Sequence, residues 1–278
     1  MPKAGGPPEV LALRETASPE SVVYDGADLY WTAGQEGDGH ILRWASGTGE
    51  VTVVASGQFS AHGLAVDAER LYWIYGLPPR VRTCRKSGGP VTEIGSASNT
   101  HRVVLDESHL YWTDFTSAGR TVLWQVPKAD PAARVPLAEG FADNYGGGIT
   151  LRPGAVYWSA NVYDRNRPDG SCASFPYPGC TRGWIWRADT SSTGTVSIVV
   201  TEDSAAILDL DVDDRGIVWT TEVAIKRAAL DGSAPEVVVD SPGRPRGILL
   251  DGDYVYWLNA RMFSDVLGAS GDVLRVRR

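Results

Sequence analysis

The sequence predicts an all-β protein, a six-bladed β-propeller built from four-stranded antiparallel blades, with residues 1–278 forming a single domain. Three observations support this prediction. An aromatic pattern occurs six times, a second position recurs at a fixed distance before it, and four short strand-like segments belong to most copies. Repeats of about 40 to 45 residues with four strands each are typical of propeller blades.

The first observation is an aliphatic-Tyr-Trp pattern whose fifth copy has Val218 in place of tyrosine. The tryptophans are separated by 42, 39, 46, 61 and 38 residues. They are Trp31, Trp73, Trp112, Trp158, Trp219 and Trp257. Because large rings fill the wedge between neighbouring blades, we interpret these aromatic residues as structural.

The second observation is a position six residues before each tryptophan. Its occupants are Asp25, Asp67, Asp106, Arg152, Asp213 and Asp251. An apolar run precedes this position and a tight polar link follows it, which together predict a β-hairpin. A third and a fourth strand-like segment complete the blade.

The third observation concerns the two ends of the chain. The sixth copy ends at Arg278 after its third segment, while residues 9–14 resemble the fourth-strand segment at 235–239. We therefore expect residues 9–14 to form the outer strand of blade six. This arrangement would remove an otherwise unpaired sheet edge.

These repeats resemble the YWTD propellers of low-density-lipoprotein-receptor ectodomains, over residues 9–278. Only Tyr111-Trp112-Thr113-Asp114 matches the motif in full, and the other five copies differ at the fourth residue. The resemblance implies a six-bladed propeller with a binding role, in a bacterial branch of these proteins.

Composition argues against several classes of partner. A net charge of −8 and a pI of about 5.1 lack the basic footprint that nucleic acids or anionic membranes require. No run approaches the ~18 apolar residues needed to span a bilayer, and residues 1–10 lack the order of a signal peptide. We expect a monomer, either cytoplasmic or, if a leader has been removed, extracytoplasmic.

Extra chain length falls mainly after the second strand of a blade. The insertions are residues 34–39, 259–271 and, longest, 160–183 in blade four. Long loops on a rigid scaffold often carry binding residues. We therefore expect this face to bind a small molecule, a glycan or a protein. The candidate ligand-binding residues are Tyr145, Tyr163, Asn259 and Arg261.

The starts of the innermost strands reach the same face, around the expected central channel. Five residues before the fixed position stand Glu20, His62, His101, Gly147, Leu208 and Arg246. The two histidines occupy equivalent places in neighbouring repeats, which allows two interpretations. Each histidine caps a loop by hydrogen bonding, or the two form a site for acid-base chemistry or for a divalent ion such as Ca, Mg or Zn. The step Ala61-His62-Gly63 is similar to one in streptogramin lyases, which implies metal and histidine at the channel mouth.

Two sets of site residues follow from that hypothesis. The candidate catalytic residues are His62, His101, Glu20 and Arg246. The candidate metal ligands are His62, His101, Asp114 and Asp209.

Asp209 and Asp211 fall within the fifth inner strand, where other blades carry mainly small or apolar residues. A buried carboxylate is costly unless it is paired or ligates an ion. A neighbouring arginine is the preferred partner, and a channel cation is the alternative.

The cysteines suggest two different roles. Cys172 and Cys180 bracket a Gly/Pro-rich segment. We expect them to form a disulfide if the protein is in an oxidising compartment, and to stay reduced if it is in the cytoplasm. Cys84 aligns with third-strand core positions, so we expect a buried core side chain.

Two functions remain open from the sequence. The favoured one is a binding or scaffold module without a redox cofactor. The alternative is a metal-assisted lyase or hydrolase that uses the histidines and carboxylates above.

Overall fold

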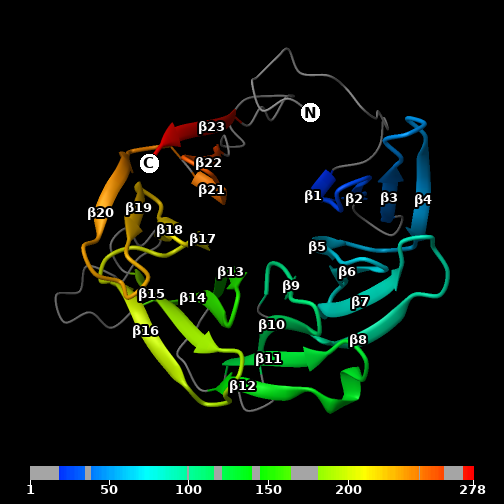
Figure 1. The fold of residues 1–278 in the computed structure, drawn as a ribbon, viewed down its shortest axis with the longest axis horizontal. Coiled ribbons are helices and arrows are strands. Elements are labelled where there is room, and N and C mark those ends of the chain that lie inside the picture. The colour runs from blue at the N-terminus through cyan, green and yellow to red at the C-terminus, as the bar shows by residue number, and fades with distance from the viewer. Residues whose placement is uncertain are drawn as a thin grey trace. The chain divides into compact units, whose positions relative to one another are not determined.

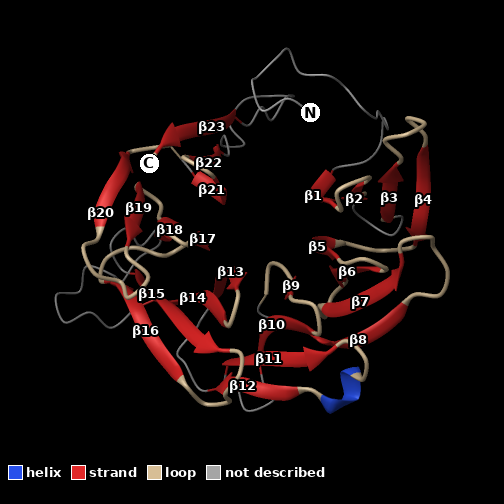
Figure 2. Ribbon diagram, viewed as in Figure 1, coloured by secondary structure: helices blue, strands red, loops and turns tan. Residues whose placement is uncertain are grey.

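The structure is a computed structural model that describes residues 19–34, 39–98, 100–115, 121–139, 145–163, 181–243, 245–259 and 272–278. Across these residues the regular structure is β, apart from one short 3-10 helix, η1 (Pro131–Ala133) (Figure 2). The chain divides into two compact units, Met1–Ser96 and Ala97–Arg278, each described by itself.

The first unit contains two four-stranded antiparallel sheets whose strands are paired in chain order (Figure 1). The first sheet comprises β1 (Pro19–Tyr24), β2 (Leu29–Ala33), β3 (His40–Trp44) and β4 (Val51–Ser56). The second comprises β5 (His62–Val66), β6 (Arg70–Tyr75), β7 (Arg80–Arg85) and β8 (Thr92–Ser96).

The second unit contains four sheets of the same type, of which the last has three strands among the described residues. The third sheet of the chain comprises β9 (Val104–Leu105), β10 (His109–Phe115), β11 (Thr121–Pro127) and β12 (Val135–Glu139). The fourth comprises β13 (Tyr145–Arg152), β14 (Ala155–Tyr163), β15 (Thr181–Asp189) and β16 (Val196–Glu202). The fifth comprises β17 (Asp209–Asp213), β18 (Gly216–Thr220), β19 (Ala224–Ala228) and β20 (Glu236–Asp240). The sixth comprises β21 (Pro245–Asp251), β22 (Tyr254–Asn259) and β23 (Asp272–Arg277).

The recurring aspartate fixes the hairpin between the first two strands of a sheet. In the second sheet, Asp67 Oδ1 accepts hydrogen bonds from the backbone N–H groups of Glu69 and Arg70, at 2.9 and 2.8 Å. The hydroxyl of Tyr72 donates to Asp67 Oδ2 at 2.9 Å. Side chains of this type bond to the backbone two or three residues on and so stabilise a tight turn.

The third sheet repeats this arrangement. Asp106 Oδ1 accepts from the backbone N–H groups of Ser108 and His109, and Tyr111 donates to Asp106 Oδ2 at 2.7 Å. Burial, together with the bond to Asp106, raises the pKa of Tyr111. In these two sheets the tyrosine of the pattern therefore has the predicted structural role, because it holds the turn of its own hairpin.

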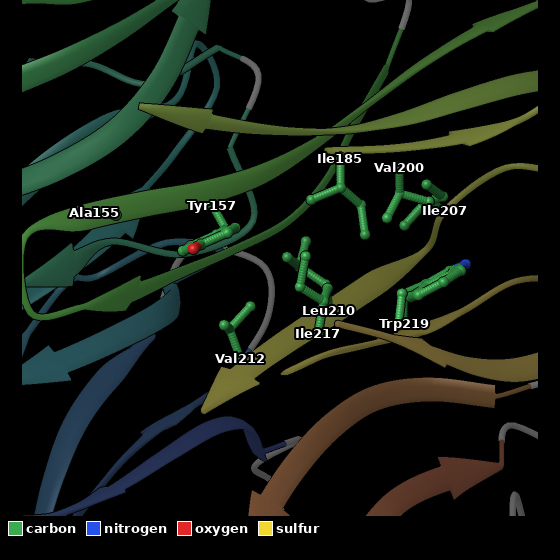
Figure 3. Packing of buried hydrophobic residues seen from close by; sticks show 10 residues of the cluster. Ala155, Tyr157, Ile185, Val200, Ile207, Leu210, Val212, Ile217 and Trp219 are labelled. Atoms are coloured by element: carbon green, nitrogen blue, oxygen red, sulfur yellow. The ribbon is translucent and has the colours of Figure 1, made fainter. Parts of the chain in front are cut away.

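The tryptophans of the pattern supply much of the core. Trp73, Trp112, Trp158 and Trp219 are almost fully buried. In the second unit, Trp219, Ile217 and Leu210 of the fifth sheet pack against Tyr157 and other residues of the fourth sheet (Figure 3). A fully buried isoleucine such as Ile217 stabilises the fold by about 1.5–3 kcal/mol.

Cys84 confirms its predicted place in the core. The thiol is fully buried among residues of the first unit, and burial raises its pKa to about 11. The segment 9–14, predicted to complete blade six, lies outside the described residues, as do Cys172 and Cys180.

The predicted 160–183 loop needs a correction at both ends. Residues up to Tyr163 belong to β14, and residues from Thr181 belong to β15. The alternating sequence Ala160-Asn161-Val162-Tyr163 suits a strand, so the paired hairpin continues into the segment that was expected to be a loop.

Candidate functional site

A buried carboxylate that bonds to several segments of the second unit lies on β17, the first strand of the fifth sheet. Asp209 is 8% exposed, and its carboxylate pairs with the Arg102 guanidinium. Asp209 Oδ1 also accepts from the backbone N–H of Leu210 at 2.9 Å, and Oδ2 accepts from that of Ile248 at 3.0 Å. One carboxylate thus connects the fifth sheet to the sixth sheet and to the segment that leads into β9 of the third sheet. The predicted pairing of Asp209 with an arginine is confirmed.

Glycine makes room for this carboxylate. A Cβ at Gly148, on β13 of the fourth sheet, would lie 2.2 Å from Asp209 Oδ1 and 2.7 Å from the backbone nitrogen of Leu210. A Cβ at Gly147 would lie 2.6 Å from the carbonyl oxygen of Ile207. These separations are too short for any side chain, so the glycine run allows β13 and β17 to approach closely.

Asp211, two residues further along β17, also connects the sheets, but through a hydroxyl and backbone N–H groups and not through the arginine that the sequence analysis preferred. Its Oδ1 accepts from the Thr150 hydroxyl at 3.0 Å and from the backbone N–H of Val212 at 2.9 Å. Its Oδ2 accepts from the backbone N–H of Leu250 at 2.9 Å. Burial raises the pKa of Asp211, although these hydrogen bonds act in the opposite direction.

The first unit contains a simpler version of this contact. Ser21 on β1 accepts a hydrogen bond through its hydroxyl from the backbone N–H of Leu64 on β5, at 3.0 Å. Ser21 and Asp209 each precede the fixed aspartate of their repeat by four residues, and so does Arg102. Sequence reasoning missed Arg102, although aligning the repeats at this position brings all three residues together.

The two predicted histidines belong to different units. In the first unit, His62 begins β5, and its Nδ1 lies 2.9 Å from the carbonyl oxygen of Ser60. This contact is the loop-capping bond that the sequence left as one alternative. In the second unit, His101 is exposed just before β9. Their convergence on one site stays a prediction.

The predicted carboxylates have described environments. Asp114 is buried, and its Oδ1 accepts from the backbone N–H of Ser98 at 2.7 Å, which secures the segment before β9. Glu20 is exposed on β1. Within the described ranges, no group of three or more His, Cys, Asp or Glu side chains is arranged to hold a metal ion.

The structure describes the positions of the remaining candidate residues, with the exception of Arg261. Tyr145 and Tyr163 lie in β13 and β14, opposite Asn161 and Thr181, and Arg246 lies in β21 opposite Leu258. Asn259 ends β22 and donates through Nδ2 to the carbonyl oxygen of Pro242. Arg261 lies outside the described residues.

The fourth sheet carries a paired extension, which we call the fourth-sheet stem: Val162 and Tyr163 opposite Arg182 and Thr181. Pairing of β14 with β15 continues five residues past Trp158, whereas pairing of β18 with β19 stops one residue past Trp219. The stem contributes the last two of these residue pairs, which extend the strands by about 7 Å past Asn161. The stem therefore projects beyond the neighbouring fifth sheet, at the end where β13 begins.

Asn161 fixes the base of this stem. The amide is fully buried, accepts from the backbone N–H of Ile207 at 2.8 Å, and donates to the carbonyl oxygen of the same residue at 3.0 Å. Both bonds join β14 to the segment that leads into β17. The stem consequently rises from a rigid base.

No known protein-family profile matches the chain. Among solved structures, it is similar to the β-propeller domain of the Trilobed protease from Pyrococcus furiosus, with a TM-score of 0.65, 8% identity, and coverage of 95% of this chain and 82% of that one. It is also similar to a chain in the nidogen/laminin complex, with a TM-score of 0.57, 18% identity, and coverage of 83% and 84%. A third similar structure is the PQQ-bound aldose sugar dehydrogenase from Streptomyces coelicolor, with a TM-score of 0.60, 13% identity, and coverage of 97% and 96%.

These similarities confirm the predicted fold class, an all-β, six-bladed β-propeller. Solved propellers of this kind occur both in a complex with another protein and as an enzyme. Among the described residues, no helix has the length and apolar character needed to cross a membrane.

Proposed function

We propose that this chain is a protein-binding module whose contact surface is the fourth-sheet stem together with residues 164–180, which connect its two strands in the sequence. The observation that supports this most directly is the stem itself. Its strands continue about 7 Å past a base held by the buried Asn161, whereas pairing of β18 with β19 stops one residue past Trp219.

The shape of the stem favours a macromolecular ligand. Small molecules are bound mainly in concave pockets, whereas a projecting hairpin presents a convex surface. Residues 164–180 include the aromatic residues Phe175 and Tyr177 and three prolines. Aromatic side chains are enriched at protein interfaces because they combine a large contact area with few rotatable bonds.

The carboxylates of the second unit support a structural role for the inner strands. Asp209 and Asp211 hold the first strands of neighbouring sheets together, through Arg102 and through the backbone N–H groups of Ile248 and Leu250. Such cross-links provide the rigid base that a binding surface needs. The similarity to a propeller solved as the nidogen/laminin complex agrees with this role.

The proposal is tested by replacing residues 166–178 with a short Gly-Ser linker and by Arg182→Glu on the stem. Arg182 is 54% exposed and pairs with Asp203 at 3.2 Å. Peptides are selected from a phage-displayed random library against the full chain, and their affinities are measured by biolayer interferometry. We expect both changes to weaken binding of the selected peptides by at least about tenfold.

The matched control is Arg277→Glu, at the opposite end of the second unit. Arg277 is 76% exposed and pairs with Asp253 at 3.5 Å. The Arg277→Glu substitution should leave the affinity for the selected peptides unchanged. Thermal unfolding should verify that all three variants fold. Peptides that bind the linker variant as well as the original chain would refute the proposal. Selective binding to a glycan array would refute the choice of a protein ligand.

The metal-assisted lyase or hydrolase remains the alternative. Elemental analysis of the purified chain before and after His62→Ala tests it directly. A stoichiometric divalent ion that is lost in this variant, while the chain stays folded, would favour the enzyme over the binding module.

A further inference from the structure

Neighbouring sheets meet in a repeated way at the turn between the third and fourth strands. In the first unit, Val54 is the extra residue of a β-bulge in the pairing of β4 with β3. A bulge leaves this residue out of the ladder, so its carbonyl is available to another sheet. A Cβ at Gly88, in the β7–β8 turn of the second sheet, would lie 3.4 Å from this carbonyl oxygen. The glycine therefore lies directly against the outer strand of the preceding sheet.

The second unit shows this contact twice among its described residues. The backbone N–H of Gly194, in the β15–β16 turn, donates to the carbonyl oxygen of the bulge residue Leu137 at 3.1 Å. A Cβ at Gly232, in the β19–β20 turn, would overlap the carbonyl oxygen of the bulge residue Val199. Gly88, Gly194 and Gly232 all have a positive φ, of 86°, 83° and 80°. Glycine suits this position because it adopts such a φ without strain and admits a carbonyl at close range.

The residue that follows each bulge is almost fully buried. These residues are Ala55, Ala138 and Val200, at 6%, 4% and 7% exposure. Each belongs to a core cluster together with a small side chain on the third strand of the next sheet. Those partners are Cys84, Ala188 and Ala228. An outer strand thus covers the third strand and the following turn of the next sheet in all three cases.

The equivalent turn of the first sheet has no such cover among the residues that the structure describes. Gly49, in the β3–β4 turn, has a φ of 71°, and its N–H donates to the carbonyl oxygen of Ala45 at 2.7 Å. The N–H of Gly88 closes its own turn in the same way. A Cβ at Gly49 would nevertheless meet no described atom within 4 Å. The turn therefore has the form needed for the contact, without a described carbonyl to complete it.

The side chains beside this turn are also incompletely covered. Trp44 occupies the third-strand position that Cys84 occupies in the second sheet, yet Cys84 is fully buried and Trp44 is only partly buried. Val51, which is paired with Trp44, is 37% exposed. We call Trp44, Gly49 and Val51 the first-sheet turn site. An apolar segment that covers this site gains the free energy of burying these side chains.

Residues 9–14 have the sequence of a strand that fits this site. The pair Leu11-Ala12 repeats Leu137-Ala138, the bulge residue of β12 and the buried alanine after it. In the three contacts above, the buried residue after the bulge precedes the fixed position of the next repeat by 12, 14 or 13 residues. Ala12 precedes Asp25, the fixed position of the first repeat, by 13 residues. Residue type and spacing both align Leu11 with the bulge and Ala12 with the buried residue.

We propose that residues 9–14 of the same chain dock on the first-sheet turn site as an outer strand. The Leu11 carbonyl meets Gly49, and the Ala12 side chain packs against Trp44 next to Val51. The segment is apolar from 10 to 13 and has one acidic and one basic residue at its ends, which suits a strand that is buried along its middle. The first unit, Met1–Ser96, contains both the site and the segment.

Nuclear magnetic resonance on the full chain tests the docking. With alanine labelled in its methyl group, we expect a nuclear Overhauser effect (NOE) between the Ala12 methyl and the Trp44 indole. The amides of residues 10–13 should exchange with solvent at least about 100-fold more slowly than in an unstructured peptide. Ala12→Asp should abolish the NOE and return these amides to fast exchange, because burying a carboxylate without a partner is costly. Ala4→Asp, five residues before the segment, should change neither quantity.

Two glycine variants test the turn. Gly49→Ala and Gly26→Ala introduce a methyl group at a positive φ, of 71° and 94°, where no described atom lies within 4 Å. The backbone strain is therefore comparable, but only Gly49 faces the proposed position of the Leu11 carbonyl. We expect Gly49→Ala to speed the exchange of residues 10–13 at least about tenfold, and Gly26→Ala to leave it within about twofold. These variants and the NOE of the original chain decide the result even if Ala12→Asp does not fold.

Three outcomes would overturn the proposal. The amides of residues 10–13 exchange as fast as in an unstructured peptide, the two glycine variants speed exchange equally, or the NOE from Ala12 appears only between differently labelled copies in a mixed sample. The last result would show that a second copy supplies the strand. Peptide binding by the fourth-sheet stem is measured separately, so either proposal can fail without the other.

Discussion

Replacing Asp209 with alanine should destabilise the second unit strongly, because its carboxylate joins the fifth sheet to the sixth sheet and to the segment that leads into β9. The change leaves the backbone N–H groups of Leu210 and Ile248 without this acceptor. Each buried donor that loses its partner costs about 1–3 kcal/mol, and we take about 1.5 kcal/mol for each. The ion pair adds at most about 1 kcal/mol, because the Arg102 side chain is 35% exposed and can reach solvent.

The sum is a loss of about 3–4 kcal/mol in the free energy of unfolding. For a domain of this size it corresponds to a melting temperature lower by about 10 °C. Urea and thermal unfolding followed by tryptophan fluorescence measure both quantities. A double-mutant cycle with Arg102→Met then separates the ion pair from the backbone contacts, since those contacts remain in Arg102→Met.

Asp203→Ala is the control for this prediction. Asp203 is 72% exposed and pairs with Arg182, so its loss should change stability by no more than about 0.5 kcal/mol. If Asp209→Ala costs less than about 1 kcal/mol, or no more than Asp203→Ala, the role assigned to the Asp209 carboxylate is wrong.

Two further changes test the packing. Gly148→Ala should lower the free energy of unfolding by about 1–3 kcal/mol, because its Cβ would lie 2.2 Å from Asp209 Oδ1. Gly47→Ala is the control, because its Cβ would meet no atom within 4 Å. Equal melting temperatures of the two variants would contradict this prediction. The Cys84 thiol has its pKa raised to about 11 by burial, so it should react with a thiol reagent at pH 8 only after unfolding, and fast labelling of the native chain would show that it is accessible. Unfolding returns the pKa of this thiol to about 9. The difference in free energy of unfolding between the original chain and Cys84→Ala should therefore be constant below pH 9 and fall as the pH rises from 9 to 11. A difference that stays flat between pH 9 and 11 would refute the burial.

The sequence predicted the parts of the fold that each repeat determines locally. Asp106 and Tyr111 are five residues apart, so their hydrogen bond follows from the repeat itself. Cys84 could be placed in the core by alignment with other third strands, and the structure confirms that place.

Contacts between repeats were harder to predict. The sequence indicated that Asp209 needs an arginine, but Arg102 is 107 residues away and was not identified. That pairing depends on Gly148, where any side chain would occupy the space of the carboxylate. The end of the fourth-sheet hairpin was misplaced because Val162 and Tyr163 suit both a strand and an exposed loop.

The hydrogen bond from tyrosine to the turn aspartate has a consequence for how such a chain diversifies. In the second and third sheets, both partners lie within one hairpin and depend on no other copy. Duplicating or exchanging such a hairpin therefore carries its anchor along with it, and only the bonds to neighbouring copies must adapt. New combinations of repeats can arise by recombination while the joints between them diverge to take on separate tasks.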